Sequence, residues 1–134
     1  MEKNFLGIDY GEKRIGLALA GEKHSVAKAF KVIHQLKELD DIVPAKNVVA
    51  FVIGLPLQPD GTEGKTAAAA RLFAARLTEK YALPIHWQDE RKTSKSAEAF
   101  LKETLYMRPD KRQEILDAES ACVILDRWLN GQKS

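Results

Sequence analysis

Residues 5–20 read FLGIDYGEKRIGLALA, and this stretch sets the beginning of the fold. Two short apolar runs, at 5–8 and 15–20, are separated by a cluster of turn-forming and charged residues that begins with Asp9. Short apolar runs bounded by such clusters are typical of strands, and a separation of a few residues favours a hairpin. We therefore expect the chain to start with two antiparallel strands, with Asp9 at the end of the first.

The segments that follow alternate between strand-like and helix-like patterns. Residues 48–54 form a continuous run rich in β-branched side chains, which is typical of a central parallel strand covered on both faces. The other expected elements are an edge strand at 26–33, a helix at 34–45, a helix from 62 or 63 to 81, a strand at 84–88, a helix from 93 or 94 to 106, a connection at 107–111 and a final helix at 112–129. This order predicts an α/β fold with a mixed five-stranded sheet and helices on both faces, in a single domain spanning residues 1–134.

The composition narrows the class of protein. The 134 residues carry 21 Lys and Arg against 19 Asp and Glu, a net charge of +2. This balance excludes a histone-like protein and an acidic disordered tail, and it leaves nucleic-acid binding open. The single cysteine, Cys122, excludes an internal disulfide and favours a reducing compartment. No apolar run approaches the roughly 20 residues of a membrane span, and no signal peptide precedes the first strand, so we expect a cytoplasmic protein.

Acidic residues follow two of the expected strands. Asp9 ends the first strand, and Asp89 and Glu90 end the strand at 84–88, at the edge where open α/β sheets usually carry their sites. Asp9 could instead only cap the hairpin turn, and the acidic pair could instead only stabilise the start of the next helix. Neighbouring residues of a strand point to opposite faces, so one member of the pair faces the site, and the pattern leaves open which.

Asp117 lies on an apolar stripe of the last expected helix. Asp117, Ala121, Ile124 and Trp128 recur at spacings of four, three and four residues, which places them on one inward face. A carboxylate on such a face is costly unless it is paired or bound to a cation. The alternative is a helix that begins later, with Asp117 as an acid of its first turn.

Taken together, the acidic positions predict a metal site. We expect the two strands to be neighbours in the sheet and the helix to pack on it, which brings the carboxylates together. Clustered carboxylates repel one another unless a divalent ion is present, and hard oxygen ligands select Mg²⁺ or Mn²⁺. Two such ions can activate water and stabilise the leaving oxygen in phosphodiester cleavage. The three histidines are scattered and lack metal-ligand spacing.

The sequence resembles the YqgF/RuvX family, the Holliday-junction-resolvase-like proteins also called pre-16S rRNA nucleases. The resemblance covers nearly the whole chain and rests on blocks that stand in the family's order. These blocks are FLGIDYGEKRIG at 5–16, IGLPL at 53–57, DGTEG at 60–64, DER at 89–91 with Thr93, and DAESA at 117–121 followed by VIL at 123–125.

The resemblance implies an RNase H-like fold and a divalent-metal nuclease that acts on structured RNA, in maturation of the 5′ end of pre-16S rRNA, or on branched DNA. By position, Asp9, Asp89, Glu90 and Asp117 match the family's acidic residues, and we assign the metal ions to Asp9, Glu90 and Asp117. Glu63 lies in a family-typical loop and either helps the site or only caps the long helix.

Basic residues beside the acids are candidates for contact with substrate phosphates. Lys13, Arg14 and Arg91 flank the proposed acids, and phosphate contacts of this kind position a backbone without reading bases. With the four candidate acids bound to metal, the rest of the surface carries a clear excess of positive charge, which suits a polyanionic partner. We expect a monomer or a homodimer.

Two rival readings remain. The segment GIDYG followed by a hairpin also resembles the phosphate loop of actin-like and sugar-kinase-like ATPases, but those proteins need two lobes and Glu12 stands where a hydroxyl residue would help hold phosphate. The other reading is a non-catalytic RNA- or ribosome-binding module that keeps the fold and the acids for stability.

Overall fold

The computed structural model describes residues 2–23, 26–90 and 108–132 of the chain. The strands are β1 (Asn4–Asp9), β2 (Ile15–Gly21), β3 (Lys28–Ile33), β4 (Val48–Leu55) and β5 (Ile85–Asp89), and the helices are the short 3-10 helix η1 (Leu36–Glu38), α1 (Leu39–Ala45), α2 (Lys65–Tyr81) and α4 (Pro109–Gly131). The helix expected between 93 and 106 and the candidate Arg91 lie outside the described residues.

The strands form one five-stranded sheet in the order β3-β2-β1-β4-β5. The pairs β1–β2 and β2–β3 are antiparallel, whereas β1–β4 and β4–β5 are parallel. This confirms the mixed sheet, the opening hairpin and the edge position of the third strand. Parallel pairing places the carboxyl ends of β1, β4 and β5 at the same edge of the sheet.

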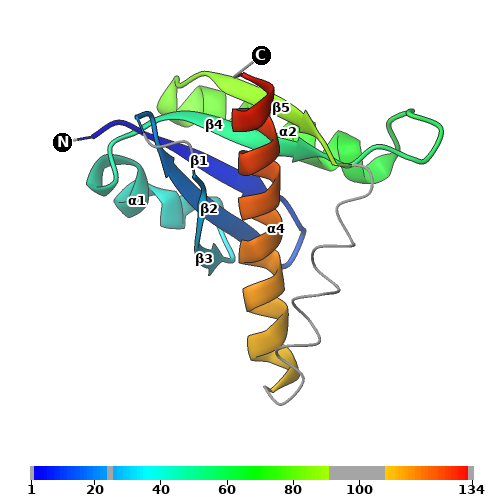
Figure 1. The fold of residues 1–134 in the computed structure, drawn as a ribbon. Coiled ribbons are helices and arrows are strands. Elements are labelled where there is room, and N and C mark those ends of the chain that lie inside the picture. Colours follow the sequence, from blue (N-terminus) through cyan, green and yellow to red (C-terminus); the bar gives the residue numbers. More distant parts are fainter. Residues whose placement is uncertain (1, 24–25, 91–107, 133–134) are drawn as a thin grey trace.

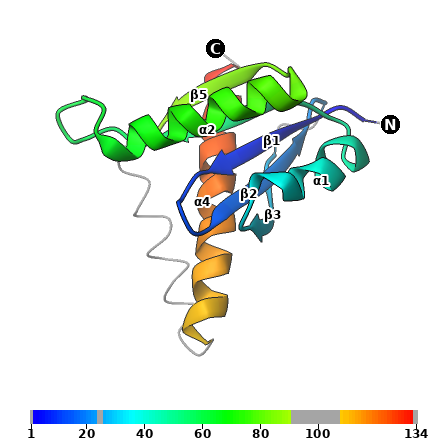
Figure 2. The ribbon, with the colours of Figure 1, turned by 180° about the vertical axis from the view of Figure 1, so that it is seen from behind.

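Helices cover both faces of the sheet, as expected. The helix α4 lies across one face and extends beyond the strands at its N-terminal end (Figure 1). The helices α1 and α2 lie on the opposite face (Figure 2). None of the helices in the described part of the chain combines the length and apolar character that crossing a bilayer requires.

The two faces of the sheet are packed with side chains of different size. Strand alternation sends large aliphatic and aromatic side chains towards α1 and α2, and full burial of each such side chain contributes about 1.5–3 kcal/mol. That core contains Leu6, Ile8, Leu17, Phe51, Ile53 and Leu77. The face under α4 is built mostly from small residues, including Gly7, Ala18 and Ala20, which meet Ala121 and Cys122 of the helix.

The C-terminal half of α4 is fixed to the sheet by aromatic contacts. The ring of Trp128 packs edge-on against Phe5 of β1, with 5.3 Å between ring centroids. The same ring stacks on His86 of β5 at 4.7 Å. Aromatic pairs at these separations stabilise a contact beyond the area they bury. Trp128 therefore ties the end of α4 to two strands of the sheet.

Two elements begin later in the chain than the sequence pattern suggests, because local side chains compete for the backbone. The strand β3 starts at Lys28, since the N–H of Ala27 donates to Asp126 of α4 at 2.9 Å. The helix expected from 34 is delayed because the Glu38 carboxylate accepts hydrogen bonds from the backbone N–H groups of His34 and Gln35.

The ends of the two long helices also differ from expectation. Glu63 pairs in an antiparallel bridge with Leu57, so α2 begins after Gly64 and not at 62 or 63. The helix α4 begins at Pro109, in the segment expected to be a connection. Proline suits the first position of a helix because its missing N–H would have no partner there.

Candidate active site

Asp9 stands between two glycines on the face of the sheet that α4 covers. Alternation along β1 places Asp9 on the same side as Phe5 and Gly7, beneath the helix. The antiparallel register pairs Asp9 with Gly16 of β2. In the parallel register Ile8 pairs with Ile53, which leaves Gly54 of β4 beside Asp9 on its other flank.

The gap above Gly54 is filled by the side chain of Glu90. A Cβ at Gly54 would lie 2.9 Å from the Glu90 carboxyl carbon and 2.5 Å from Cδ1 of Ile124. The strand β4 separates β1 from β5, so the expectation that the two acid-bearing strands are neighbours is wrong. The acids meet because Gly54 has no side chain to keep Glu90 away from Asp9.

The structure brings Glu90, and not Asp89, to Asp9. The backbone N–H of Glu90 donates to the Leu55 carbonyl at 3.1 Å, so the pairing with β4 continues one residue past the end of β5. Alternation then places Glu90 on the same face as His86, which stacks on α4. Asp89 falls on the opposite face with Trp87, which packs against the large-residue core.

A hydrogen bond joins the carboxyl groups of Asp9 and Glu90, and the pair holds a proton. Burial raises the pKa of Asp9 to about 6, with a further rise from the charge of Asp117 that opposes the lowering effect of the Glu90 hydrogen bond. Burial, the charge of Asp9 and the hydrogen bond to Asp9 raise the pKa of Glu90 to about 8. Two close, desolvated carboxyls cannot both ionise without a compensating positive charge.

Asp117 reaches the same place from α4. Its backbone carbonyl lies directly over Gly16, where any Cβ would overlap it. Asp117 lies well inside the helix that begins at Pro109, which excludes a first-turn acid. Ala121 and Ile124 of the same stripe are fully buried, as the helical spacing indicates.

Both carboxylate oxygens of Asp117 have partners within the protein. The Nε of Arg14 donates to Oδ2 at 2.7 Å, and Nε2 of Gln113 donates to Oδ1 at 3.0 Å. Arg14 belongs to the loop between β1 and β2, so this ion pair connects the hairpin to α4. The structure thus shows Arg14 bound to an acid of the site, where the sequence suggested contact with substrate.

The donor set suits a hard divalent cation, although the third acid is turned towards Arg14. Within residues 2–23, 26–90 and 108–132, no three His, Cys, Asp or Glu side chains converge closely enough to hold an ion. Asp9 and Glu90 do converge, and the proton that they retain is a charge that a cation would replace. Carboxylate oxygens are the ligands that Mg²⁺ and Mn²⁺ prefer.

Asp9 and Asp117 open onto a surface hollow of about 350 Å³. Its lining comes from the hairpin loop and α4, namely Asp9, Tyr10, Gly11, Glu12, Lys13, Arg14 and Asp117. Lys13 is exposed at the rim, in the position the sequence suggested for a phosphate contact. The ring nitrogen Nδ1 of His34 is 3.0 Å from the Lys13 carbonyl oxygen and ties this loop to the end of β3.

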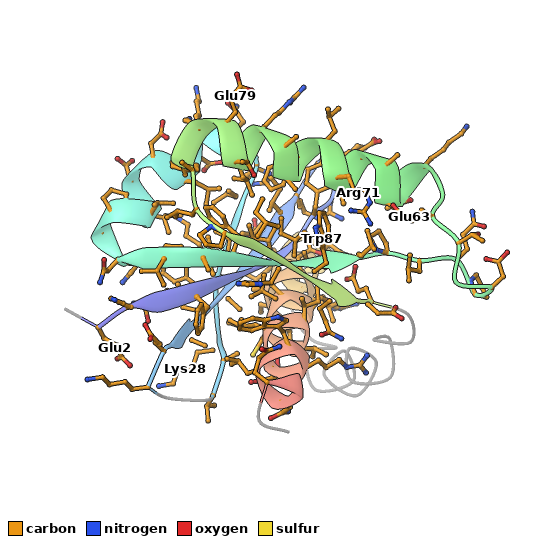
Figure 3. The ribbon with its side chains drawn as sticks, turned by 90° about the horizontal axis from the view of Figure 1, so that it is seen from above. Glu2, Lys28, Glu63, Arg71, Glu79 and Trp87 are labelled. Carbon is orange, nitrogen blue, oxygen red and sulfur yellow. The ribbon has the colours of Figure 1, made fainter. Side chains whose placement is uncertain are left out.

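Glu63 neither faces the acidic pair nor caps α2. Its carboxylate accepts two hydrogen bonds from Arg71 of α2, one of them at 3.0 Å from Nη2. The Arg71 guanidinium lies over the ring of Trp87 on β5, 4.9 Å from its centroid (Figure 3). The N-cap of α2 is Gly64, with no side-chain cap. Glu63 therefore ties the loop between β4 and α2 (residues 56–64) to α2.

Three residues that shape the site were missed at the level of sequence. Gly16 and Gly54 interrupt apolar strands, and a glycine inside a strand is a known signal of close approach by another segment. Gln113 precedes Asp117 by four residues, the spacing at which helix side chains meet. Each signal was present, but each gains meaning only from the partner that the fold supplies.

Comparison with solved structures identifies the class of fold. The structure resembles Thermus thermophilus RuvC with a TM-score of 0.57 at 11% identity, covering 97% of this chain and 96% of that one. It also resembles T. thermophilus RuvC in complex with Holliday junction substrate, with a TM-score of 0.58 at 12% identity over 98% and 96% of the two chains. The fold is RNase H-like.

The family is shown by sequence. The model of the RuvX family, described as Holliday junction resolvase, matches residues 3–131. A protein of Burkholderia ambifaria named "Putative pre-16S rRNA nuclease" is 40% identical over 96% of this chain and 90% of its own length. A protein of the same name from Burkholderia multivorans is 37% identical over the same shares. The chain belongs to the RuvX family, a family of nucleases.

Proposed function

We propose that this protein is a divalent-metal-dependent nuclease, a single domain that hydrolyses a phosphodiester bond in structured RNA, in maturation of the 5′ end of pre-16S rRNA. The observation that carries the proposal is the partly buried Asp9–Glu90 pair with Asp117 beside it, at the edge of an open hollow. Such a pair is costly to maintain, which supports a role in binding and not in stability.

Asp9, Glu90 and Asp117 are the residues proposed to hold Mg²⁺ or Mn²⁺. When bound, a divalent ion activates the attacking water and stabilises the leaving oxygen. The carboxylates of Asp9 and Glu90 release their shared proton when they ligate, so binding is expected to strengthen as pH rises through the range of their raised pKa values. Asp89 points to the other face and is assigned no ligand role.

The basic hairpin loop positions the substrate. Lys13 stands exposed at the rim of the hollow, where its ammonium group can approach the phosphate on either side of the cleaved bond. A contact of this kind fixes register and supplies affinity without reading bases. This accords with a substrate recognised by its shape.

A second candidate activity is the resolution of branched DNA. The family description and the RuvC neighbour bound to a Holliday junction favour it. Both activities use the same acids and differ only in the nucleic acid that reaches the hollow. A cleavage assay on both kinds of nucleic acid therefore distinguishes the two activities.

The test is a cleavage assay with purified protein on precursor 16S rRNA and on four-way DNA junctions, with Mg²⁺, Mn²⁺ or a chelator. We expect metal-dependent cleavage of the rRNA precursor that is lost in Asp9→Asn and Asp117→Asn proteins of unchanged fold. Preferential cleavage of junctions would establish the second candidate. Binding without cleavage by the wild-type protein would instead indicate a non-catalytic RNA-binding module.

A further inference from the structure

Arg14 forms an ion pair with Asp117, the third acid of the proposed site. Its Nε lies 2.7 Å from Oδ2 of Asp117, and 40% of the Arg14 side chain is exposed against 17% of the Asp117 side chain. The acid is held inside while its partner reaches it from the surface. The Arg14 guanidinium can move away from Asp117 and remain hydrated by solvent. The less exposed Asp117 carboxylate would then need another positive charge to compensate its own.

The backbone around Arg14 makes contacts that favour movement of its side chain over movement of the loop. The preceding residue, Lys13, is anchored through its carbonyl oxygen to His34. Gly11 packs so tightly in this loop that a Cβ there would lie 2.7 Å from the Arg14 carbonyl oxygen. Arg14 lines the same hollow as Asp9 and Asp117, so its guanidinium can reach a ligand there by a change of side-chain conformation.

Resting on the proposed function, we propose that Arg14 is an exchangeable counter-ion: it pairs with Asp117 in the metal-free protein and is released to a substrate phosphate when a divalent cation takes that carboxylate. A guanidinium and a divalent ion compete for the same carboxylate oxygen, Oδ2 of Asp117. Once freed, the planar guanidinium matches the geometry of a phosphate. Cation binding and nucleic-acid binding are then positively coupled through one side chain.

The competing interpretation is a fixed support, in which Arg14 holds Asp117 in the position that a cation needs. The two interpretations predict opposite signs. Removal of a competitor strengthens cation binding, whereas removal of a support weakens it. Gln113 contacts the other oxygen from within α4 and keeps Asp117 oriented in either case.

The first experiment measures Mn²⁺ binding by calorimetry in the absence of nucleic acid, for the wild type, Arg14→Gln and Lys13→Gln. The Lys13 variant is the matched control because it removes an equal charge from the same loop and the same hollow. We expect Arg14→Gln to bind Mn²⁺ about fivefold more tightly than Lys13→Gln, because an ion pair of this kind contributes modestly. Equal or weaker binding by Arg14→Gln overturns the proposal.

The second experiment measures coupling by fluorescence anisotropy, with a hairpin RNA and a four-way DNA junction as probes. Ca²⁺ is expected to increase the affinity of the wild type over that in EDTA, and Arg14→Gln is expected to lose most of that increase. Lys13→Gln, which removes a proposed phosphate contact, is expected to bind more weakly both with and without Ca²⁺ while keeping the same fold increase. An equal increase in both variants overturns the proposal. If Arg14→Gln unfolds, Arg14→Lys replaces it, with the same directions expected at smaller size.

These outcomes separate this inference from the function on which it rests. A wild-type protein that binds no Mn²⁺ and cleaves no nucleic acid refutes both. A wild-type protein that binds and cleaves, with the two variants alike in cation affinity, refutes the exchange alone.

Discussion

The sheet presents large aliphatic side chains to α1 and α2, and mostly glycine and alanine to α4. On the first face, bulk fills space and removes apolar surface from water. On the second, the absence of bulk lets a helix backbone lie directly over Gly16 and lets a carboxyl group lie over Gly54. One sheet can therefore keep its stability on one side and hold an acidic site on the other.

The largest expected effect is on the α4 face. Glu90→Gln is expected to reduce cleavage by about a thousandfold, since a metal ligand supports several kcal/mol of transition-state stabilisation and each 1.36 kcal/mol is tenfold in rate. Its neighbour Asp89, on the other face, provides the control, and Asp89→Asn is expected to lose less than about tenfold by the same scale. Single-turnover cleavage rates measure both. A larger loss for Asp89 would reverse the assignment of the two acids.

The α2 face is tested by a change in stability. Leu77 of α2 is fully buried, and Leu77→Ala is expected to lower the free energy of unfolding by about 2–5 kcal/mol. Leu72, on the same helix and 60% exposed, supplies the matched control, with Leu72→Ala within about 0.5 kcal/mol of wild type. Urea unfolding measures both. Cleavage per folded molecule is expected to stay unchanged, and a loss there would show that the faces are not separate.

Adding a methyl group probes the close approach on the α4 face. Gly16→Ala is expected to push α4 away from the sheet, with a cost of about 1–3 kcal/mol for overpacking and a fall in cleavage as Asp117 moves. At Gly131, by contrast, an added Cβ meets nothing within 4 Å, so Gly131→Ala is the control. Thermal unfolding and cleavage rates are the readouts. Tolerance of alanine at Gly16 would contradict the close contact.

The last expected effect is a pH dependence of stability in metal-free protein. The pKa values of Asp9 and Glu90 are raised to about 6 and about 8, so the folded state holds protons that the unfolded chain releases. Their contribution is complete below about pH 4 and is lost as pH rises through 6 and 8. Each pKa is raised by more than one unit, so the loss exceeds about 1.4 kcal/mol for each group.

Urea unfolding in chelator across pH 5–9 measures this loss. Glu90→Gln is expected to flatten the profile, and Glu79→Gln, at an exposed position on α2, is expected to leave it as in wild type. A profile that rises with pH over this range would contradict the raised pKa values.

The sequence predicts the features that depend on short-range pattern. The two apolar runs at 5–8 and 15–20 and the turn between them produce the hairpin, and helical spacing places Asp117 on the buried stripe. The ends of helices and strands are harder to predict from sequence, because each depends on a single local interaction that competes with the regular backbone hydrogen bonds. The Glu38 carboxylate and the Leu57–Glu63 bridge both delay a helix that propensity alone would start earlier.

The site itself depends on contacts between distant segments, which pattern does not reveal. The choice between Asp89 and Glu90 is made by one further hydrogen bond to Leu55, and the meeting of Glu90 with Asp9 is made by Gly54 on the strand between them. The partner of Arg14 lies 103 residues along the chain. The position of Arg14 near Asp9 in the sequence suggested a substrate contact, whereas in the fold Arg14 pairs with Asp117.

The aromatic contacts of Trp128 have a mechanical consequence for the site. Asp117 and Trp128 stand on one rigid helix about 16 Å apart along its axis, from 1.5 Å for each residue. Trp128 packs against Phe5 and His86. If α4 rotated about this contact, a tilt of about 4° would displace Asp117 by about 1 Å over that length of helix. Misplacement of that size can cost on the order of a hundredfold in rate. The position of Asp117 therefore depends on the packing of aromatic rings at the other end of α4, which do not line the hollow.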